Sequence, residues 1–444
     1  YENDGGIMFT DSSHIFVLLN AIHDNLGSGL SLANGLGTGC EFVGLMDNII
    51  ERNKSHGISS SGGDLVVVTN NIIRDNWNTG IWMSGPSRIS AGFNTIETNG
   101  LHDFSGYGIV QDALGGIGVR GLPLAAPSVN CFHLRENRVN NNNSPSLPAS
   151  TGIYVNNDVS ALPKIIEYNV ISGQDRAVWI TGMADTTLVM GNSLNAAEFT
   201  VANTDPVNHL YAPANWHGSA DPAVVRALNM AAADYSPWLL SGISADALAF
   251  GFFPDLAGLG VDDDSVDATG AGYIAEAVST VFPGGEIRVY AGTYNEGVDI
   301  QNSVTLIAPD GPAATIVDGA GTARISTGMA DIPFMFIPSA DGVALSVDGF
   351  SFTTAMSGIK ASDLNSFAND SLSINNCNFS AIDPAGVAVS VEFCSADIGG
   401  STFSGPGAGI RIANASDCNI IGNTISGGQN YGITINEQTV SGVA

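Results

Sequence analysis

The chain has 444 residues, of which 44% are hydrophobic and only 13% are charged, so it can bury a large core. Its 14 Lys and Arg residues against 43 Asp and Glu residues give a net charge of −29, which argues against nucleic acid or an anionic membrane as a partner. No run of about 20 apolar residues predicts a transmembrane segment.

An asparagine motif repeats through the first part of the chain. Each copy has an Asn, an apolar residue two positions later and a second Asn five positions after the first, and the copies begin at Asn20, Asn48, Asn71 and Asn94. The spacings of 28, 23 and 23 residues suit one coil of a solenoid. Alternating apolar residues precede each Asn, which predicts a strand with one buried face. The alternation shifts by one at the Asn, so each Asn marks a corner.

A glycine followed by an apolar residue begins another short strand in each copy, as at Gly57-Ile58 and Gly80-Ile81. Successive coils would pair in parallel about 4.8 Å apart, so equivalent Asn amides would hydrogen-bond in a ladder. The pattern continues more loosely toward the C-terminus. The predicted structural ladder consists of Asn20, Asn48, Asn71, Asn94, Asn137, Asn169, Asn192 and Asn423.

The third and fourth positions after each Asn form a predicted exposed stripe of charged residues. This stripe includes Asp24, Arg52, Arg74 and Asp75. Charge signs alternate from coil to coil, which favours a structural role in which neighbouring charges pair. The alternative is a sugar-binding or lytic groove, in which these four residues are the catalytic candidates.

Four ring-bearing side chains lie close to a long excursion from the coil at residues 100–130, namely Trp77, Trp82, His102 and Tyr107. Trp82 falls between Ile81 and Met83, so it should point outward if its neighbours point inward. An exposed aromatic ring on such a face can stack on a sugar, so these four residues are candidates for contact with a carbohydrate or a partner, although packing beneath the excursion is the simpler interpretation.

The repeats resemble the right-handed parallel β-helices of the pectin-lyase-like superfamily, and they cover most of the chain. Residues 268–319 are similar to the opening of such a domain, where an amphipathic helix, here residues 273–278, plugs the end of the solenoid. Residues 215–239 resemble the closing segment of many secreted bacterial β-helices. The resemblance implies an all-β fold of two tandem right-handed parallel β-helix domains, residues 1–241 and 267–444, joined by a linker at 242–266. The second would open with a short amphipathic capping helix.

The two ends of the chain enter and leave coils directly, so we expect an excerpt of a longer protein, with coils missing before the first domain and after the second.

An acidic group near the linker, Asp262, Asp263, Asp264 and Asp267, offers oxygen ligands for Ca²⁺, although a solvated acidic surface is the simpler interpretation. No cofactor is required. The five cysteines are too scattered for a disulfide framework, and Cys377 replaces a corner Asn, which predicts stacked core thiols.

Polysaccharide lyases, hydrolases and epimerases occur in this superfamily, but none of their compact catalytic motifs is recognisable here. The first functional hypothesis is therefore an extracellular structural or adhesive cell-surface protein that forms a rigid rod, surface layer or fibre by self-association. The alternative is a polysaccharide-acting enzyme or a carbohydrate-binding module on the β-helix face. Charges that pair with one another would favour the first hypothesis, and charges that converge on an empty cleft would favour the second.

Overall fold

The structure is a computed structural model whose residues divide into two compact units, Tyr1–Asp255 and Leu256–Ala444. The division lies inside the linker predicted from the sequence. The structure describes residues 3–33, 39–84, 88–100, 117–120, 131–142, 150–157, 163–182, 187–205, 207–318, 333–337, 342–353, 357–362, 370–380, 386–405, 408–414, 417–427 and 431–436.

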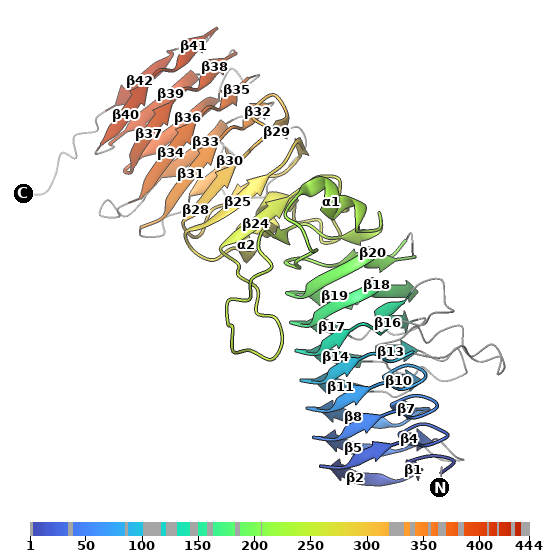
Figure 1. Ribbon diagram of the computed structural model, residues 1–444. Coiled ribbons are helices and arrows are strands. Elements are labelled where there is room, and N and C mark those ends of the chain that lie inside the picture. Colours follow the sequence, from blue (N-terminus) through green and yellow to red (C-terminus); the bar gives the residue numbers. More distant parts are fainter. Residues whose placement is uncertain are drawn as a thin grey trace, which may run out of the picture. The chain divides into compact units, whose positions relative to one another are not determined.

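The first unit is a stack of coils (Figure 1). Its strand order defines three faces. One face has the order β1 (Ile7–Thr10), β4 (Leu30–Ala33), β7 (Ile58–Ser60), β10 (Ile81–Ser84), β13 (Ile117–Arg120), β16 (Thr151–Asn157). The second has β2 (Ser13–Leu18), β5 (Glu41–Met46), β8 (Asp64–Thr69), β11 (Arg88–Gly92), β14 (Cys131–Arg135), β17 (Lys164–Glu167), β19 (Thr187–Met190), β21 (Leu210–Tyr211), β22 (Ala233–Asp234). The third has β3 (Ala21–His23), β6 (Ile49–Glu51), β9 (Ile72–Arg74), β12 (Thr95–Glu97), β15 (Arg138–Asn140).

One long strand joins the first and third faces. Strand β18 (Val170–Gly182) pairs with both β15 and β16, and β20 (Ser193–Asn203) pairs with β18 in turn. These pairings are parallel, which confirms the predicted parallel β-helix. The unit also contains helix α1 (Pro222–Ala227) and the short strand β23 (Trp238–Leu239).

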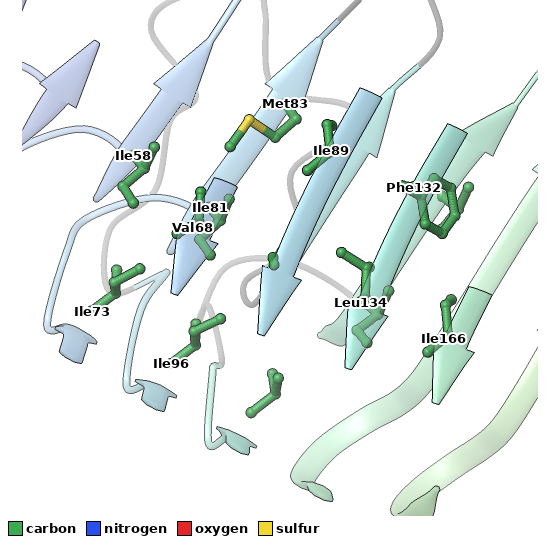
Figure 2. Close-up of a cluster of buried hydrophobic side chains, with 14 of the residues drawn as sticks. Ile58, Val68, Ile73, Ile81, Met83, Ile89, Ile96, Phe132, Leu134 and Ile166 are labelled. Carbon is green, nitrogen blue, oxygen red and sulfur yellow. The ribbon is translucent and has the colours of Figure 1, made fainter. Parts of the chain in front are cut away.

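The core of the first unit is built from columns of aliphatic side chains. In one column Ile58 and Ile81 are register partners with at most 1% exposure, and in another Val68 lies beside Ala91 (Figure 2 shows part of this core). Equivalent residues stack because parallel strands in register place like side chains above one another. The alternating apolar pattern thus becomes a continuous core along the coil axis.

Two hydrogen-bonded rows of asparagines run through the corners. In the first row each Nδ2 donates to the next Oδ1 at 2.9–3.1 Å, through Asn20, Asn48, Asn71, Asn94, Asn137, Asn169, Asn192 and Asn215. The second row is joined in the same way at 2.8–2.9 Å, through Asn25, Asn53, Asn76, Asn99 and Asn142. Between the rows, corner residues such as Arg52 (φ 55°) and Asp75 (φ 55°) adopt the left-handed conformation, which turns the chain sharply.

The second row ends at a glutamine. Ser172 pairs with Asn140, and Gly173 (φ 71°) takes the left-handed corner position, so Gln174 is the equivalent of Asn142. Gln174 is only 3% exposed, yet its amide makes no hydrogen bond within the part of the chain that the structure describes. A glutamine is one methylene longer than asparagine, which moves the amide out of the ladder.

We therefore expect Gln174→Asn to extend the ladder and to raise the free energy of unfolding by about 1 kcal/mol. The new Oδ1 would accept a bond from the Asn142 backbone N–H, as Asn142 does for Asn99 at 3.1 Å. Denaturant unfolding monitored by tryptophan fluorescence measures the change. Gln174→Leu is the control, because it removes the buried amide without adding a ladder bond. A larger increase in the free energy of unfolding for Gln174→Leu than for Gln174→Asn would contradict the explanation that a ladder hydrogen bond stabilises the asparagine variant.

Residues after β23 fold back over the corners of the first unit. The Phe252 N–H donates to the Tyr168 carbonyl at 2.8 Å, and Arg138 Nε donates to the Phe250 carbonyl at 2.6 Å. Gly251 fits only as glycine, because a Cβ there would lie 2.3 Å from the Tyr168 carbonyl oxygen. Residues 250–253 of the predicted linker therefore belong to the surface of the first unit.

The second unit is also a stack of parallel coils (Figure 1). One sheet contains β24 (Gly258–Val261), β25 (Gly285–Val289), β28 (Val304–Ile307), β31 (Ala344–Asp348), β34 (Ser371–Asn375), β37 (Ser395–Gly399), β40 (Cys418–Ile421). The next has β26 (Gly292–Tyr294), β29 (Thr315–Asp318), β32 (Ser351–Thr353), β35 (Asn378–Phe379), β38 (Thr402–Ser404), β41 (Thr424–Ser426). The last has β27 (Val298–Asp299), β30 (Pro333–Ile337), β33 (Ser357–Ser362), β36 (Val387–Glu392), β39 (Ala408–Ala413), β42 (Ile433–Asn436).

Helix α2 (Tyr273–Thr280) lies against β24, β25 and β27 with Ile274 and Ala277 fully buried. Its amphipathic pattern matches the helix predicted from the sequence, and its role as an end cap stays a prediction.

The corner row of this unit mixes residue types. The Cys377 N–H donates to Ser401 Oγ at 3.1 Å, and the Ser401 N–H donates to Asn423 Oδ1 at 2.9 Å. Burial raises the pKa of the Cys377 thiol to about 12, so this thiol stays protonated at neutral pH.

Candidate functional site

The charged stripe at the corners of the first unit is internally paired. Arg52 Nε donates to Asp24 Oδ1 at 3.0 Å, and Arg74 Nε donates to Glu51 Oε2 at 2.8 Å. Arg52 also contacts Glu51. Asp75 accepts a hydrogen bond from Thr98 Oγ1 at 2.6 Å. The four stripe residues singled out in the sequence thus bond to neighbours on the same or adjacent coils.

These pairs keep the carboxylates of Asp24 and Glu51 ionised. Hydrogen bonds from Arg52 and then His23 lower the pKa of Asp24 to about 2. The hydrogen bond from Arg74 likewise lowers the pKa of Glu51, against the opposing effect of burial. A general acid needs a pKa near the working pH, so Asp24 and Glu51 are poorly suited to donate a proton. The side chains of Asp24, Arg52 and Arg74 are roughly half exposed, so their ion pairs contribute little to stability.

A second candidate site lies on the outer face of the sheet that contains β10, β13, β16 and β18. Strand register places Trp82, Gly118, Tyr154 and Trp179 in one row across these four strands. The neighbours of Trp82 in sequence, Ile81 and Met83, are at most 1% exposed, so the indole lies on the outside of the coil. Parallel register therefore gathers three aromatic residues that lie far apart in the sequence.

The rings of this row are held by specific contacts. Tyr154 and Trp179 have ring centroids 5.0 Å apart, and the Tyr154 hydroxyl lies 3.3 Å from Thr181 Oγ1. The Arg176 guanidinium lies 4.5 Å from the centroid of Trp179, a cation–π contact. Tyr154 is 7% exposed, whereas Trp82 and Trp179 are half-buried. Tyr154 thus supports the more accessible Trp179.

Trp82 is backed by an imidazole. The rings of His56 and Trp82 are stacked with centroids 5.4 Å apart and an interplanar angle of 15°. Burial lowers the pKa of His56 to about 4, so the imidazole is neutral at pH 7. A neutral stacked ring fixes the indole orientation without adding charge to the face.

Hydroxyl groups continue the row beyond Trp82. Ser59 is the register partner of Trp82, and Ser31 is the partner of Ser59. The two hydroxyls lie 3.0 Å apart and are half-buried. The row therefore offers both ring surfaces and hydroxyl donors and acceptors.

The other aromatic candidates from the sequence do not join this row in the described structure. Trp77 lies at a corner, where the Lys54 ammonium lies 5.6 Å from its ring centroid. His102 and Tyr107 lie outside the described residues. Tyr154 and Trp179 were missed, although Trp179 shows the same signal as Trp82, an aromatic between two apolar residues in a strand, Val178 and Ile180.

The acidic group in the second unit is only partly gathered. Asp262, Asp263 and Asp264 each place a carboxylate oxygen within 4.8 Å of the others. Asp267 instead accepts from the Gly270 N–H at 2.6 Å and the Gly272 N–H at 3.2 Å, closing a turn. Asp263 accepts from the Thr293 N–H at 2.7 Å. Calcium binding by these residues stays a prediction.

Among the described residues, no helix is long and apolar enough to span a membrane.

A family model described as "Right handed beta helix region" matches residues 1–99 and 45–194. Together with the stacked parallel sheets, this match identifies a right-handed β-helix in the first unit. No match was found among curated proteins.

Similar solved structures include a PL6 family alginate lyase, AlyGC, with 11% identity and a TM-score of 0.23, covering 97% of this chain and 88% of the lyase. A variant of the same lyase has 11% identity and a TM-score of 0.20, covering 93% of this chain and 80% of the variant. These scores are too low to transfer an activity to this chain.

Proposed function

We propose that this right-handed β-helix protein binds a polysaccharide along the outer face of its first unit. The observation that carries the proposal is the row of Trp82, Tyr154 and Trp179, aligned by register across β10, β16 and β18. Aromatic rings present flat apolar surfaces with a negative face, which suits the C–H groups of a sugar ring. Such rings on a rigid scaffold form a preorganised binding surface.

The spacing of the row favours a polymer over a single sugar. Trp82 and Trp179 are separated by three strand intervals, which corresponds to roughly 14 Å at the usual strand spacing. The residue between Trp82 and Tyr154 in the row is Gly118, so no side chain of the row separates them. A ligand that contacts both indoles must therefore extend over several coils.

The paired charges at the corners support binding without bond cleavage. Asp24, Glu51 and Asp75 each accept a hydrogen bond from a neighbouring coil. The proposal accordingly assigns no catalytic residue. An extracellular, adhesive or structural role, the first hypothesis from the sequence, is compatible with this proposal, because a rigid rod that holds a polysaccharide would anchor to a cell surface or matrix.

The test compares tryptophans on and off the row. We expect Trp179→Ala and Trp82→Ala each to weaken polysaccharide binding by about tenfold, the effect of losing one stacking contact of about 1.4 kcal/mol. Trp77→Ala is the matched control, since Trp77 is also half-buried but lies at a corner outside the row. Affinity electrophoresis through gels that contain soluble polysaccharides measures the change, with circular dichroism to verify folding. Equal effects at all three tryptophans, or none, would refute the proposal.

A further inference from the structure

We infer that the polysaccharide held by the Trp82–Trp179 row is uncharged. This inference rests on the proposed function and specifies its ligand. It follows from the charges placed beside the rings, from the field of the whole chain, and from the neutral polar groups along the row.

One cation beside the row, Arg176, is already neutralised by an ion pair. Arg176 lies against Trp179, and its Nε donates to Glu198 Oε2 at 3.0 Å while its Nη2 donates to Glu198 Oε1 at 3.4 Å. The exposed fraction of the side chain is 21% for Arg176 and 45% for Glu198. A carboxylate on the ligand would have to displace Glu198, which is already bonded through both oxygens. Such an exchange gains little, because one ion pair replaces another.

A second carboxylate lies next to this pair. Asp175 precedes Arg176, and its Oδ2 accepts from the Ser150 N–H at 2.8 Å and from Ser150 Oγ at 2.9 Å. Asp175 and Glu198 together outweigh the single positive charge of Arg176. The chain as a whole carries −29, so its long-range field also opposes the approach of a polyanion.

Neutral polar groups also lie along the row. Ser31 and Ser59 present hydroxyls, and Thr181 presents another beside Tyr154. Trp82 is stacked on His56, whose imidazole is uncharged at pH 7. Hydroxyl groups and ring faces match the hydroxyl groups and C–H faces of an uncharged sugar, and neither requires a charged partner.

The experiment uses the full chain in affinity electrophoresis with two probes, hydroxyethylcellulose as the uncharged polymer and polygalacturonate as the anionic one. Each gel is run at about 20 mM and at about 500 mM NaCl, since the higher salt screens charges beyond a few ångströms. We expect retardation by hydroxyethylcellulose that is the same at both salt concentrations, and none by polygalacturonate. Retardation by polygalacturonate that equals or exceeds that by hydroxyethylcellulose, and that is lost at high salt, would overturn the inference.

A charge variant tests the role of the ion pair. Glu198→Gln frees Arg176, so we expect polygalacturonate to retard this variant at low salt, where it does not retard wild type, with retardation by hydroxyethylcellulose unchanged. Asp64→Asn is the control, because it removes the ion-pair partner of Arg88 on another face. We expect no retardation of this variant by polygalacturonate. Equal retardation of both variants by polygalacturonate would contradict the inference that the Arg176–Glu198 pair excludes anionic polymers. If neither polymer retards wild type, or Trp179→Ala binds like wild type, the proposed function itself fails.

Discussion

Replacing Asn94 with alanine should lower the free energy of unfolding of the first unit by about 4 kcal/mol. Asn94 is fully buried, and its Nδ2 donates to the carbonyls of Val68 at 2.9 Å and Gly92 at 3.0 Å. It also donates to Asn137 Oδ1 at 3.0 Å, while its own Oδ1 accepts from the Asn71 N–H and Nδ2, each at 3.0 Å. Alanine removes all five bonds and leaves buried partners unsatisfied.

Tryptophan fluorescence during guanidinium unfolding measures this loss selectively, because all five tryptophans lie before residue 256. Asn20→Ala is the matched control from the same row. Asn20 is exposed, and its Nδ2 donates only to the Leu18 carbonyl and Asn48 Oδ1, so we expect a cost below about 1 kcal/mol. Similar costs at Asn94 and Asn20 would mean that the ladder is not a buried network.

The repeat made the fold predictable from the sequence. A regular spacing of the Asn motif requires coils of nearly equal length, and stacked coils of equal length bring the asparagines into one column. The same logic placed Trp82 outside, because residues on either side of it were apolar. Here the local pattern and the global fold agree, so the fold class can be predicted from a single sequence.

The aromatic row was less accessible to sequence reasoning. Tyr154 and Trp179 follow irregular coils, so their distance from Trp82 in sequence shows no period. Their alignment depends on the register of β13 with β10 and with β16. In the sequence these strands are separated by long segments of variable length. Register between distant strands is set by the buried partners of the whole stack rather than by the residues of the row.

The partners of the corner charges were only partly predictable. Alternating signs indicated pairing between coils, and Arg74 does bond to Glu51 on the preceding coil. Arg52, however, bonds both to Asp24 on the preceding coil and to its own sequence neighbour Glu51. Long flexible side chains choose among several nearby carboxylates, and the choice depends on rotamers that a sequence pattern does not specify. The predicted Asn ladder also omitted Asn215, which accepts the last hydrogen bond of the first Asn row.

In the second unit, Phe379→Ala should cost about 4 kcal/mol of stability. Phe379 is fully buried between Phe352 and Phe403, with centroids 4.9 Å from each ring and interplanar angles of 11° and 1°. Alanine opens a cavity and removes two stacking contacts at once. Circular dichroism during guanidinium unfolding measures the loss. Phe282→Ala is the control, since Phe282 is 50% exposed and should change stability by less than about 0.5 kcal/mol.

Phe379→Leu separates cavity formation from stacking. Leucine refills most of the volume but breaks both ring contacts, so we expect an intermediate cost of about 2 kcal/mol. A cost near zero would mean that burial alone stabilises this column. Because tryptophan fluorescence reports only the first unit, a loss confined to circular dichroism would show that the second unit unfolds separately. A matching shift in fluorescence would instead mean that the two stacks of coils unfold as one cooperative structure.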